Sequence, residues 1–184
     1  MAHKSDVIRI LALREYGGIY MDMDLFAVKP FDDLMYAPAT MALQRKAGYD
    51  YFCNAFIMAE RRSRFMDLWW QSYEHFDHTI WDWNSGAKPF MIAKAFSDDI
   101  QALNGSAIFS PLWTDAAKPL VDNDIDFRED GHYAYHGWHR SAVDLFDSLN
   151  PRAIREVDTS FNRLVRPYLG EHDDDVWDTI HASP

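Results

Sequence analysis

The chain of 184 residues lacks several features, and each absence narrows what the protein can be. It contains a single cysteine, Cys53, so no disulfide can form within the chain. No run of about 18 apolar residues occurs, which argues against a membrane-spanning helix. The first residues, Met-Ala-His-Lys-Ser-Asp, lack the apolar centre of a signal peptide. These absences predict a cytoplasmic protein, with a peripheral association at a membrane as an open alternative.

Positive charge is also scarce. The chain has 18 Lys and Arg residues against 29 Asp and Glu residues, a formal net charge of −11. Proteins that bind phosphate backbones need clustered Lys and Arg, so the charge balance argues against nucleic acid as a partner. An acidic protein can still bind a nucleotide where a divalent cation supplies positive charge locally.

Several catalytic motifs are missing as well. The sequence has no P-loop, no Gly-X-Gly-X-X-Gly and no Gly-X-Ser-X-Gly. His75 and His78 are one helical turn apart, but no third ligand follows nearby, and a metal site needs three or four. A metal-dependent phosphohydrolase would require more carboxylates or histidines at ordered spacing than the chain offers.

Predicted helices and strands alternate along the chain with short connections, which indicates a single α/β domain over 1–170. The acidic residues from 171 to 184 are predicted to form a tail. Helical spacing, with Ser5 and Ser63 as caps and Gly17 as the terminating residue, predicts largely apolar helices over about 6–16, 64–76, 88–97 and 152–169. Short apolar runs predict strands over 19–21, 25–28, 40–44, 52–59, 107–109 and 133–136. Loops are predicted over 81–86 and 122–130, and the tail is predicted to be a frayed helix or disordered.

The most informative stretch is Glu-Tyr-Gly-Gly-Ile-Tyr-Met-Asp-Met-Asp-Leu-Phe at 15–26. A double glycine precedes a short strand, and Asp22 and Asp24 follow it. Alternate side chains of a strand point the same way, so both carboxylates should face one side. Two carboxylates placed in this way suit a hard cation such as Mg²⁺ or Mn²⁺. An isolated Asp-X-Asp arises often by chance, and the alternative is a solvated acidic turn.

The pattern around these carboxylates is longer and more specific. It comprises Ser-Asp-Val-Ile-Arg at 5–9, Tyr-Gly-Gly-Ile-Tyr at 16–20, Asp-Met-Asp at 22–24 and Lys-Pro at 29–30. With this pattern, residues 4–31 resemble the glycosyltransferases that have a DXD sugar-binding region. That family includes bacterial capsular and lipopolysaccharide sugar transferases and yeast mannosyltransferases, and the large clostridial glucosylating toxins look similar in the same region.

The resemblance implies a GT-A-like, Rossmann-like α/β fold, a nucleotide-diphosphate sugar as donor, and Mn²⁺ or Mg²⁺ as cofactor. By position it implies that Arg9, Asp22 and Asp24 are catalytic and that Asp22 and Asp24 bind the metal. Asp6 and Arg9 would contact hydroxyls of the donor sugar, Tyr20 would line the donor pocket, and Asp22 would also touch ribose or sugar. The alternative for Asp6 and Arg9 is a capping carboxylate and a surface cation.

Weaker signals lie downstream. Asn54 stands where members of the family carry an asparagine near the sugar, or else it is a strand-end amide paired to the backbone. Gly-Ala-Lys-Pro at 86–89 loosely resembles a family turn that opens a helix facing the acceptor. Tyr-His-Gly-Trp at 135–138 with Ser141 resembles a late family motif, although an alanine replaces the tryptophan expected after the serine. His136, Trp138 and Ser141 are therefore predicted to bind substrate. His136 could be a third metal ligand or a contact to the diphosphate, and the alternative is a histidine satisfied by backbone hydrogen bonds.

The resemblance predicts a retaining, metal-dependent hexosyltransferase of polysaccharide biosynthesis, which moves a sugar from the donor to a saccharide or lipid-linked acceptor. A front-side displacement and a covalent intermediate are both compatible with retention. The strands that usually form the base pocket are short or missing, so the alternative is a non-catalytic remnant that binds a sugar nucleotide or a glycan. The candidate stacking surfaces for an acceptor are Trp69, Trp70, Trp81, Trp83, Trp113 and Trp138. Of these, Trp69 and Trp70 are expected in the core.

Overall fold

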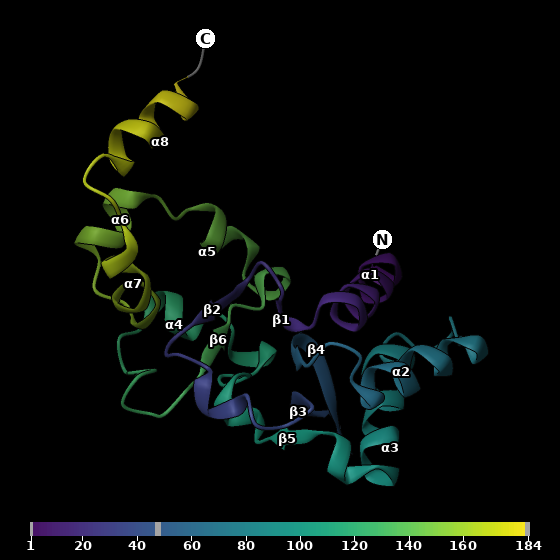
Figure 1. Ribbon diagram of the computed structural model, residues 1–184. Helices are drawn as coiled ribbons and strands as arrows, with labels where there is room; N and C mark the ends of the chain where they lie inside the picture. The colour runs from purple at the N-terminus through teal and green to yellow at the C-terminus, as the bar shows by residue number, and fades with distance from the viewer. Residues whose placement is uncertain (1, 47–48, 183–184) are drawn as a thin grey trace.

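Two β-sheets with covering helices form the architecture of the computed structural model, which describes residues 2–46 and 49–182 (Figure 1). The larger sheet has the strand order β1-β4-β3-β5, in which β4 runs antiparallel to β1 and β3, and β5 runs parallel to β3. The smaller sheet pairs β2 and β6 antiparallel. The strands are β1 Gly18–Met21, β2 Leu25–Ala27, β3 Ala39–Lys46, β4 Tyr49–Ala59, β5 Gln101–Leu103 and β6 Ala134–His136.

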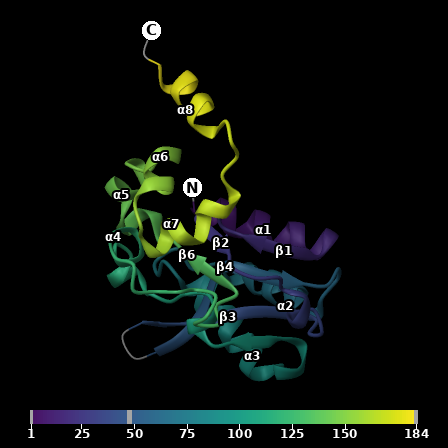
Figure 2. The same cartoon turned by 90° about the vertical axis from the view of Figure 1, so that its left-hand side faces the viewer.

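Helices flank the sheets on two sides. Figures 1 and 2 show α1, α2 and α3 on one side of the molecule and α4 to α7 on the other, with α8 standing away from both. The helices are α1 Ala2–Tyr16, α2 Arg64–Gln71, α3 Lys88–Ala95, α4 Lys118–Val121, α5 Val143–Asp147, α6 Pro151–Glu156, α7 Ser160–Val165 and α8 Asp173–His181.

Strand β4 joins the two main parts of the core because its side chains alternate between the faces of the sheet. Ile57 packs into a buried cluster with Ile10 of α1 and Trp69 of α2. Phe56 and Met58 point the other way, into a second cluster beneath the β2–β6 sheet. A third cluster lies under α4 and α7. The larger sheet is therefore covered on both faces, and its strand ends are held in place from both sides.

The N-terminal predictions are confirmed in outline. Helix α1 ends at Tyr16, Gly17 adopts a left-handed φ of 68°, and β1 follows at once. The helix begins at Ala2, however, so Ser5 lies inside it and is not its cap. Ile8 and Leu11 are exposed, so only some of the apolar side chains of this helix are buried. The strands predicted over 25–28, 40–44, 52–59 and 133–136 correspond to β2, β3, β4 and β6.

Three other predictions are wrong. Residues 107–109 form no strand, and the neighbouring strand is β5, which pairs with β3. Residues Trp83–Ala87 form a π-helical turn that leads directly into α3, where a loop was expected. The helix predicted over 152–169 is divided into α6, α7 and a 3₁₀ turn, because Thr159 accepts a hydrogen bond from the Asn162 amide and starts a new helix.

Two further segments differ in extent. Helix α2 stops at Gln71 and continues as a 3₁₀ turn over Ser72–His75. The acidic tail contains α8, none of whose side chains is buried. Within the described residues, no helix is both long enough and apolar enough to cross a membrane. The whole is a mixed α/β fold that is compatible with a GT-A-like domain.

Gly17 allows a test of how β1 is brought into place. An added Cβ would meet the Arg61 amide nitrogen at 2.6 Å, and the positive φ strains any other residue. We expect Gly17→Ala to lower the free energy of unfolding by about 2 kcal/mol or more, measured by denaturant unfolding. Gly131→Ala is the matched control, because Gly131 also has a positive φ of 80° but open space around it. Equal losses in the two variants would contradict the steric part of this account.

His132 gives the stability a pH dependence. Burial lowers the pKa of His132 below its usual value of 6.5, so the folded state binds its proton less readily than the unfolded state. Stability from this group is complete above pH 6.5 and is lost as the pH falls below it, with a slope of up to about 1.4 kcal/mol per pH unit. We expect His132→Gln to flatten the loss of unfolding free energy between pH 7 and pH 5. The same change at the exposed His78 should leave it unaltered.

Candidate active site

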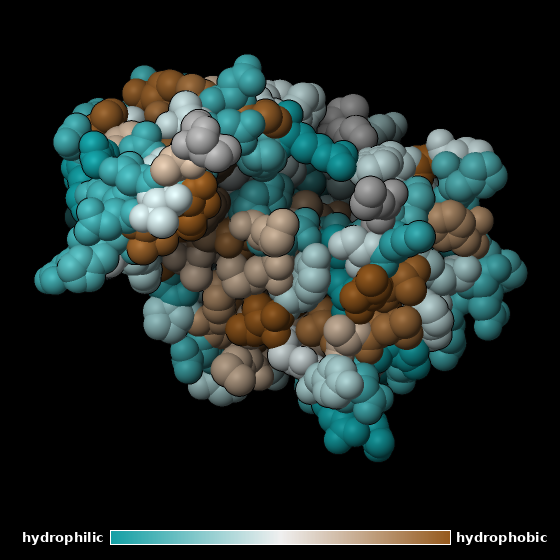
Figure 3. All heavy atoms as spheres, turned by 90° about the horizontal axis from the view of Figure 1, so that it is seen from above, coloured by the Kyte–Doolittle hydropathy of each residue, from teal (hydrophilic) through white to brown (hydrophobic). Residues whose placement is uncertain are grey.

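A cleft of about 860 Å³ opens between α1, the turn from β1 to β2, strand β4 and the chain after β6. Seen from above, the surface is hollowed between the side that carries α5 to α8 and the side that carries α1, with polar and apolar residues side by side around the hollow (Figure 3). A cleft of this size and mixed lining is typical of small-molecule sites.

A tight turn places Asp22 and Asp24 in this cleft. Strand β1 ends at Met21, the Asp22 amide donates to the Ala55 carbonyl at 2.9 Å, and the Leu25 amide donates back to the Asp22 carbonyl at 3.0 Å. Met23 at the tip is fully exposed. The two carboxylates lie on one side, as predicted. A turn brings them together, however, whereas the prediction relied on the alternation of side chains in a strand.

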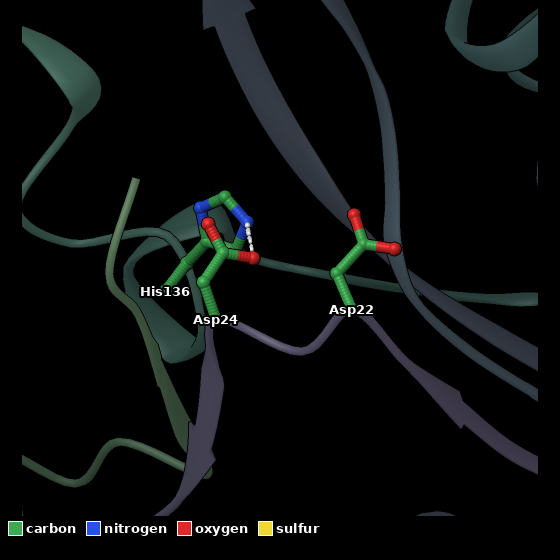
Figure 4. Close-up of side chains that lie close together, drawn as sticks. All are labelled: Asp22, Asp24 and His136. Atoms are coloured by element: carbon green, nitrogen blue, oxygen red, sulfur yellow. Dashed lines mark ion pairs between the residues drawn. The ribbon is translucent and has the colours of Figure 1, made fainter. Parts of the chain in front are cut away.

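His136, at the end of β6, faces the same turn from the neighbouring strand. Figure 4 shows its ring and the Asp24 carboxylate pointing toward each other, with Asp22 across the turn. His136 Nε2 lies 3.5 Å from Asp24 Oδ1, and the residue is 6% exposed. Burial lowers the pKa of His136, although the nearby Asp24 charge opposes that shift. The imidazole is therefore neutral near pH 7, the form in which it can bind a metal.

These three residues fit a divalent cation. Asp22, Asp24 and His136 each offer one ligand atom, and the three atoms lie within 4.8 Å of one another. Two carboxylate oxygens and one imidazole nitrogen form a donor set that suits Mn²⁺ or Mg²⁺. The Nδ1 atom of His136 is buried and has no hydrogen-bond partner among the described residues, so no backbone bond fixes the ring as a purely structural histidine.

The loop that follows β6 is fastened to Asp24. The Gly137 amide donates to the Asp24 carbonyl at 2.7 Å, and the His139 amide donates to Asp24 Oδ2 at 3.0 Å. Between them Trp138 adopts a left-handed φ of 50°, which is strained for a tryptophan. Its indole nitrogen donates to the Pro111 carbonyl at 3.0 Å, and its ring packs edge-on against His136 at 4.0 Å. These contacts hold the loop over the carboxylates.

Arg9 links α1 to the Asp-Met-Asp turn and to β4. Its Nη1 donates to the Asn54 carbonyl at 2.6 Å and lies 3.1 Å from Asp22 Oδ1. Its Nη2 donates to Ser5 Oγ at 3.0 Å and lies 3.6 Å from Asp6 Oδ1. The Arg9 side chain is 6% exposed, so it is not a surface cation. One buried guanidinium therefore forms ion pairs with both Asp6 and Asp22.

Tyr20 and Asn54 complete this network. The Tyr20 hydroxyl donates to Asp22 Oδ1 at 2.7 Å, and its ring lies 4.4 Å from the guanidinium carbon of Arg9. Burial, followed by the hydrogen bond to Asp22, raises the pKa of Tyr20. The Asn54 amide donates to Asp6 Oδ1 at 2.7 Å, so it pairs with a carboxylate rather than with the backbone. Asp6 is buried within α1 and caps nothing.

The structure brings the predicted site residues to one cleft, although their roles stay predictions. Residues from α1, β1, β4 and the chain after β6 line it together: Asp6, Arg9, Tyr20, Asp22, Asp24, Asn54, His136, Trp138 and Ser141. Gly86 is different. It is buried where an added Cβ would meet the Phe52 carbonyl at 2.6 Å, so its role here is close packing of the π-helical turn against β4.

Sequence reasoning missed other residues of the cleft. Ser5 orients Arg9, a role that its spacing of four residues on one helix could have indicated. The His139 amide holds Asp24 through the backbone, which no side-chain pattern reveals. His3, on α1, and Arg140, in the chain after β6, also line the cleft. Their positions depend on long-range contacts, so no local signal marks them.

Comparison with known proteins agrees with this geometry. Residues 1–40 match the family described as a glycosyltransferase sugar-binding region containing DXD motif. The chain is also 40% identical over 185 residues to the protein named Glucan organizing enzyme 1 of Cryptococcus neoformans var. grubii serotype A. That alignment covers 96% of this chain and 50% of the relative, so the chain spans about half the relative's length. The resemblance to the DXD glycosyltransferases is confirmed.

The Arg9 network predicts that replacing Arg9 destabilises the protein much more than replacing an arginine in an exposed ion pair. Removing Arg9 leaves the Asp6 and Asp22 charges without their cation, and breaking a buried pair from one side costs about 3 kcal/mol. We expect Arg9→Met to lower the unfolding free energy by about that amount, measured by urea denaturation, and Asp6→Asn in the same chain to recover part of the loss. The control is Arg14→Met, whose partly exposed pair with Asp67 should contribute less than about 1 kcal/mol. Similar losses for the two arginines would contradict a special role for Arg9.

Proposed function

We propose, on the premise that residues 1–40 carry the sugar-binding region of the DXD glycosyltransferases, that this chain forms the catalytic site of a metal-dependent, retaining hexosyltransferase with a GT-A-type fold. It takes a sugar from a nucleotide-diphosphate donor and transfers it to a saccharide or lipid-linked acceptor. The observation that carries the proposal is the meeting, in one cleft, of the Asp22–Asp24–His136 group and the Arg9 network.

The two parts of the cleft suit the two parts of such a donor. Asp22, Asp24 and His136 would hold Mn²⁺ or Mg²⁺. A cation there would act as a Lewis acid and neutralise charge on the departing diphosphate. Asp6 and Asn54, joined by a hydrogen bond of 2.7 Å, present acceptors and donors to the hydroxyls of a sugar. The donor would therefore lie along the cleft, with its diphosphate at the turn and its sugar over α1.

Arg9 adds fixed positive charge next to the metal group. Its Nη1 lies 3.1 Å from Asp22 Oδ1, and Ser5 and Asn54 hold the guanidinium in place before any ligand binds. A preorganised cation stabilises the negative charge that develops on a leaving diphosphate without reorganising in the reaction. The loop 137–141 is fastened to Asp24 by the Gly137 and His139 amides and lines the same cleft.

The proposed acceptor class rests on the Cryptococcus relative. The name of the Cryptococcus relative contains the word glucan, and this chain aligns with half of that protein. We therefore propose a glucan or a related hexose polymer as the acceptor and polysaccharide biosynthesis as the setting.

Substitutions of Asp24 and His136 should weaken both metal binding and sugar transfer. We expect Asp24→Asn and His136→Gln each to weaken Mn²⁺ binding at least about tenfold, measured by isothermal titration with a nucleoside diphosphate present. Transfer or hydrolysis of a nucleotide sugar should fall by at least about 100-fold in Asp24→Asn. Asp32→Asn, at an exposed carboxylate outside the cleft, is the control and should change neither quantity.

The outcomes distinguish an enzyme from a binding protein. Metal-dependent turnover that disappears in Asp24→Asn supports the transferase. Tight binding of nucleotide sugars by the wild type without turnover, across a panel of donors, would instead indicate a non-catalytic sugar-nucleotide-binding protein. Equal Mn²⁺ affinity in the wild type and Asp24→Asn would contradict the proposed metal group.

A further inference from the structure

We infer that the end of the cleft beside His3 and Trp81, with Phe76 packed against His3, is a binding subsite for a saccharide ring of the acceptor. This inference rests on the proposed function and adds to it the place and the chemistry of acceptor recognition. It starts from a large aromatic side chain that the fold leaves uncovered. Trp81 is 60% exposed, yet it lines the same cleft as Asp22 and Asp24.

The three rings form one surface. The His3 ring lies 5.1 Å from the Phe76 ring, edge to face, and 5.8 Å from the Trp81 ring. Phe76 is 41% exposed, and its ring contacts the Tyr73 ring. The Tyr73 ring in turn stacks on Trp70, which packs against the core. A row of aromatic rings thus runs from the interior to the rim of the cleft. Trp81 and Phe76 leave much of their apolar surface uncovered, and such a surface beside a cleft is typical of a binding site.

The segment that carries Trp81 is held rigidly although its side chain is exposed. Asn84 is 1% exposed; its amide oxygen accepts from the Asp77 amide at 3.1 Å, and its backbone carbonyl accepts from the Trp69 indole at 2.9 Å. Lys88 donates to the Ser72 carbonyl at 2.7 Å. The rim is therefore preorganised, and a ligand that covers Trp81 does not have to order the loop first.

An unbroken line of contacts leads from this rim to the metal group. His3 Nδ1 lies 3.7 Å from Asp6 Oδ2, Asp6 Oδ1 lies 3.6 Å from Arg9 Nη2, and Arg9 Nη1 lies 3.1 Å from Asp22 Oδ1. In a transfer reaction the moving sugar must touch both the leaving diphosphate and the acceptor. With the diphosphate at Asp22 and the sugar over Asp6 and Arg9, the acceptor comes to lie at the aromatic end.

The chemistry of this end suits a sugar ring. A pyranose presents a face of C–H bonds and an edge of hydroxyls, so it needs a flat apolar surface with polar groups beside it. Trp81 and Phe76 supply aromatic faces, and Ser85, which lines the same cleft as Trp81, supplies a hydroxyl. A lipid chain has no groups to pair with these polar neighbours.

The test is the binding of α-linked and β-linked gluco-pentaoses to the full chain, measured by isothermal titration with Mn²⁺ and a nucleoside diphosphate present. We expect Trp81→Ala to weaken binding of the preferred pentaose about three- to tenfold and Phe76→Ala to weaken it less. Trp81→Phe should restore most of the affinity. Trp113→Ala is the matched control, because Trp113 is 47% exposed but lies outside the cleft.

The results separate this inference from the proposed function. Binding of Mn²⁺ and nucleoside diphosphate should be the same in all four variants. If Trp81→Ala binds pentaose as the wild type does, or if no pentaose binds the wild type, the acceptor subsite is wrong while the donor site stands. If pentaose binding depends on Trp81 but the nucleoside diphosphate does not bind, the saccharide surface stands and the proposed transferase function is wrong.

Discussion

The site depends on one buried guanidinium, that of Arg9. It lies between Asp6 on its own helix and Asp22 on the following turn, and it donates to the backbone of Asn54 on the central strand. Without this cation, two carboxylates would face each other across a cleft that already carries a third. The charge of Arg9 lets α1, the β1–β2 turn and β4 come together, and that meeting forms the cleft that Asp22, Asp24 and His136 line together with Asp6 and Asn54.

The rest of the fold positions this contact. Gly17 turns the chain from α1 into β1 within one residue, and β1 pairs with β4, which runs through both halves of the core. Strand β6 then brings His136 to the turn, and the loop after it closes on Asp24. Each element near the cleft is thus fixed by contacts that are distant in sequence, whereas Asp6 with Arg9 and Asp22 with Asp24 lie on short local motifs.

That division explains what could be predicted from the sequence. Gly17, the short strand after it and the Asp-Met-Asp turn are local signals, and the pattern over residues 4–31 indicated the resemblance to the DXD glycosyltransferases. Residues 107–109 were mistaken for a strand because Ile108 and Phe109 are fully buried, and a buried turn and a buried strand give the same short apolar run. Strand β5 carries no strong signal and forms because it can pair with β3. The approach of Trp81 to His3 is likewise tertiary, so the sequence offered Trp81 only as one of several exposed candidates.

The most direct measurement of the central claim is a crystal structure with Mn²⁺ and a nucleoside diphosphate, using the anomalous scattering of manganese to locate the ion. We predict an anomalous peak between Asp22, Asp24 and His136, with the diphosphate next to it and the Arg9 side chain unmoved. A diphosphate bound with its manganese away from these three residues would contradict the account.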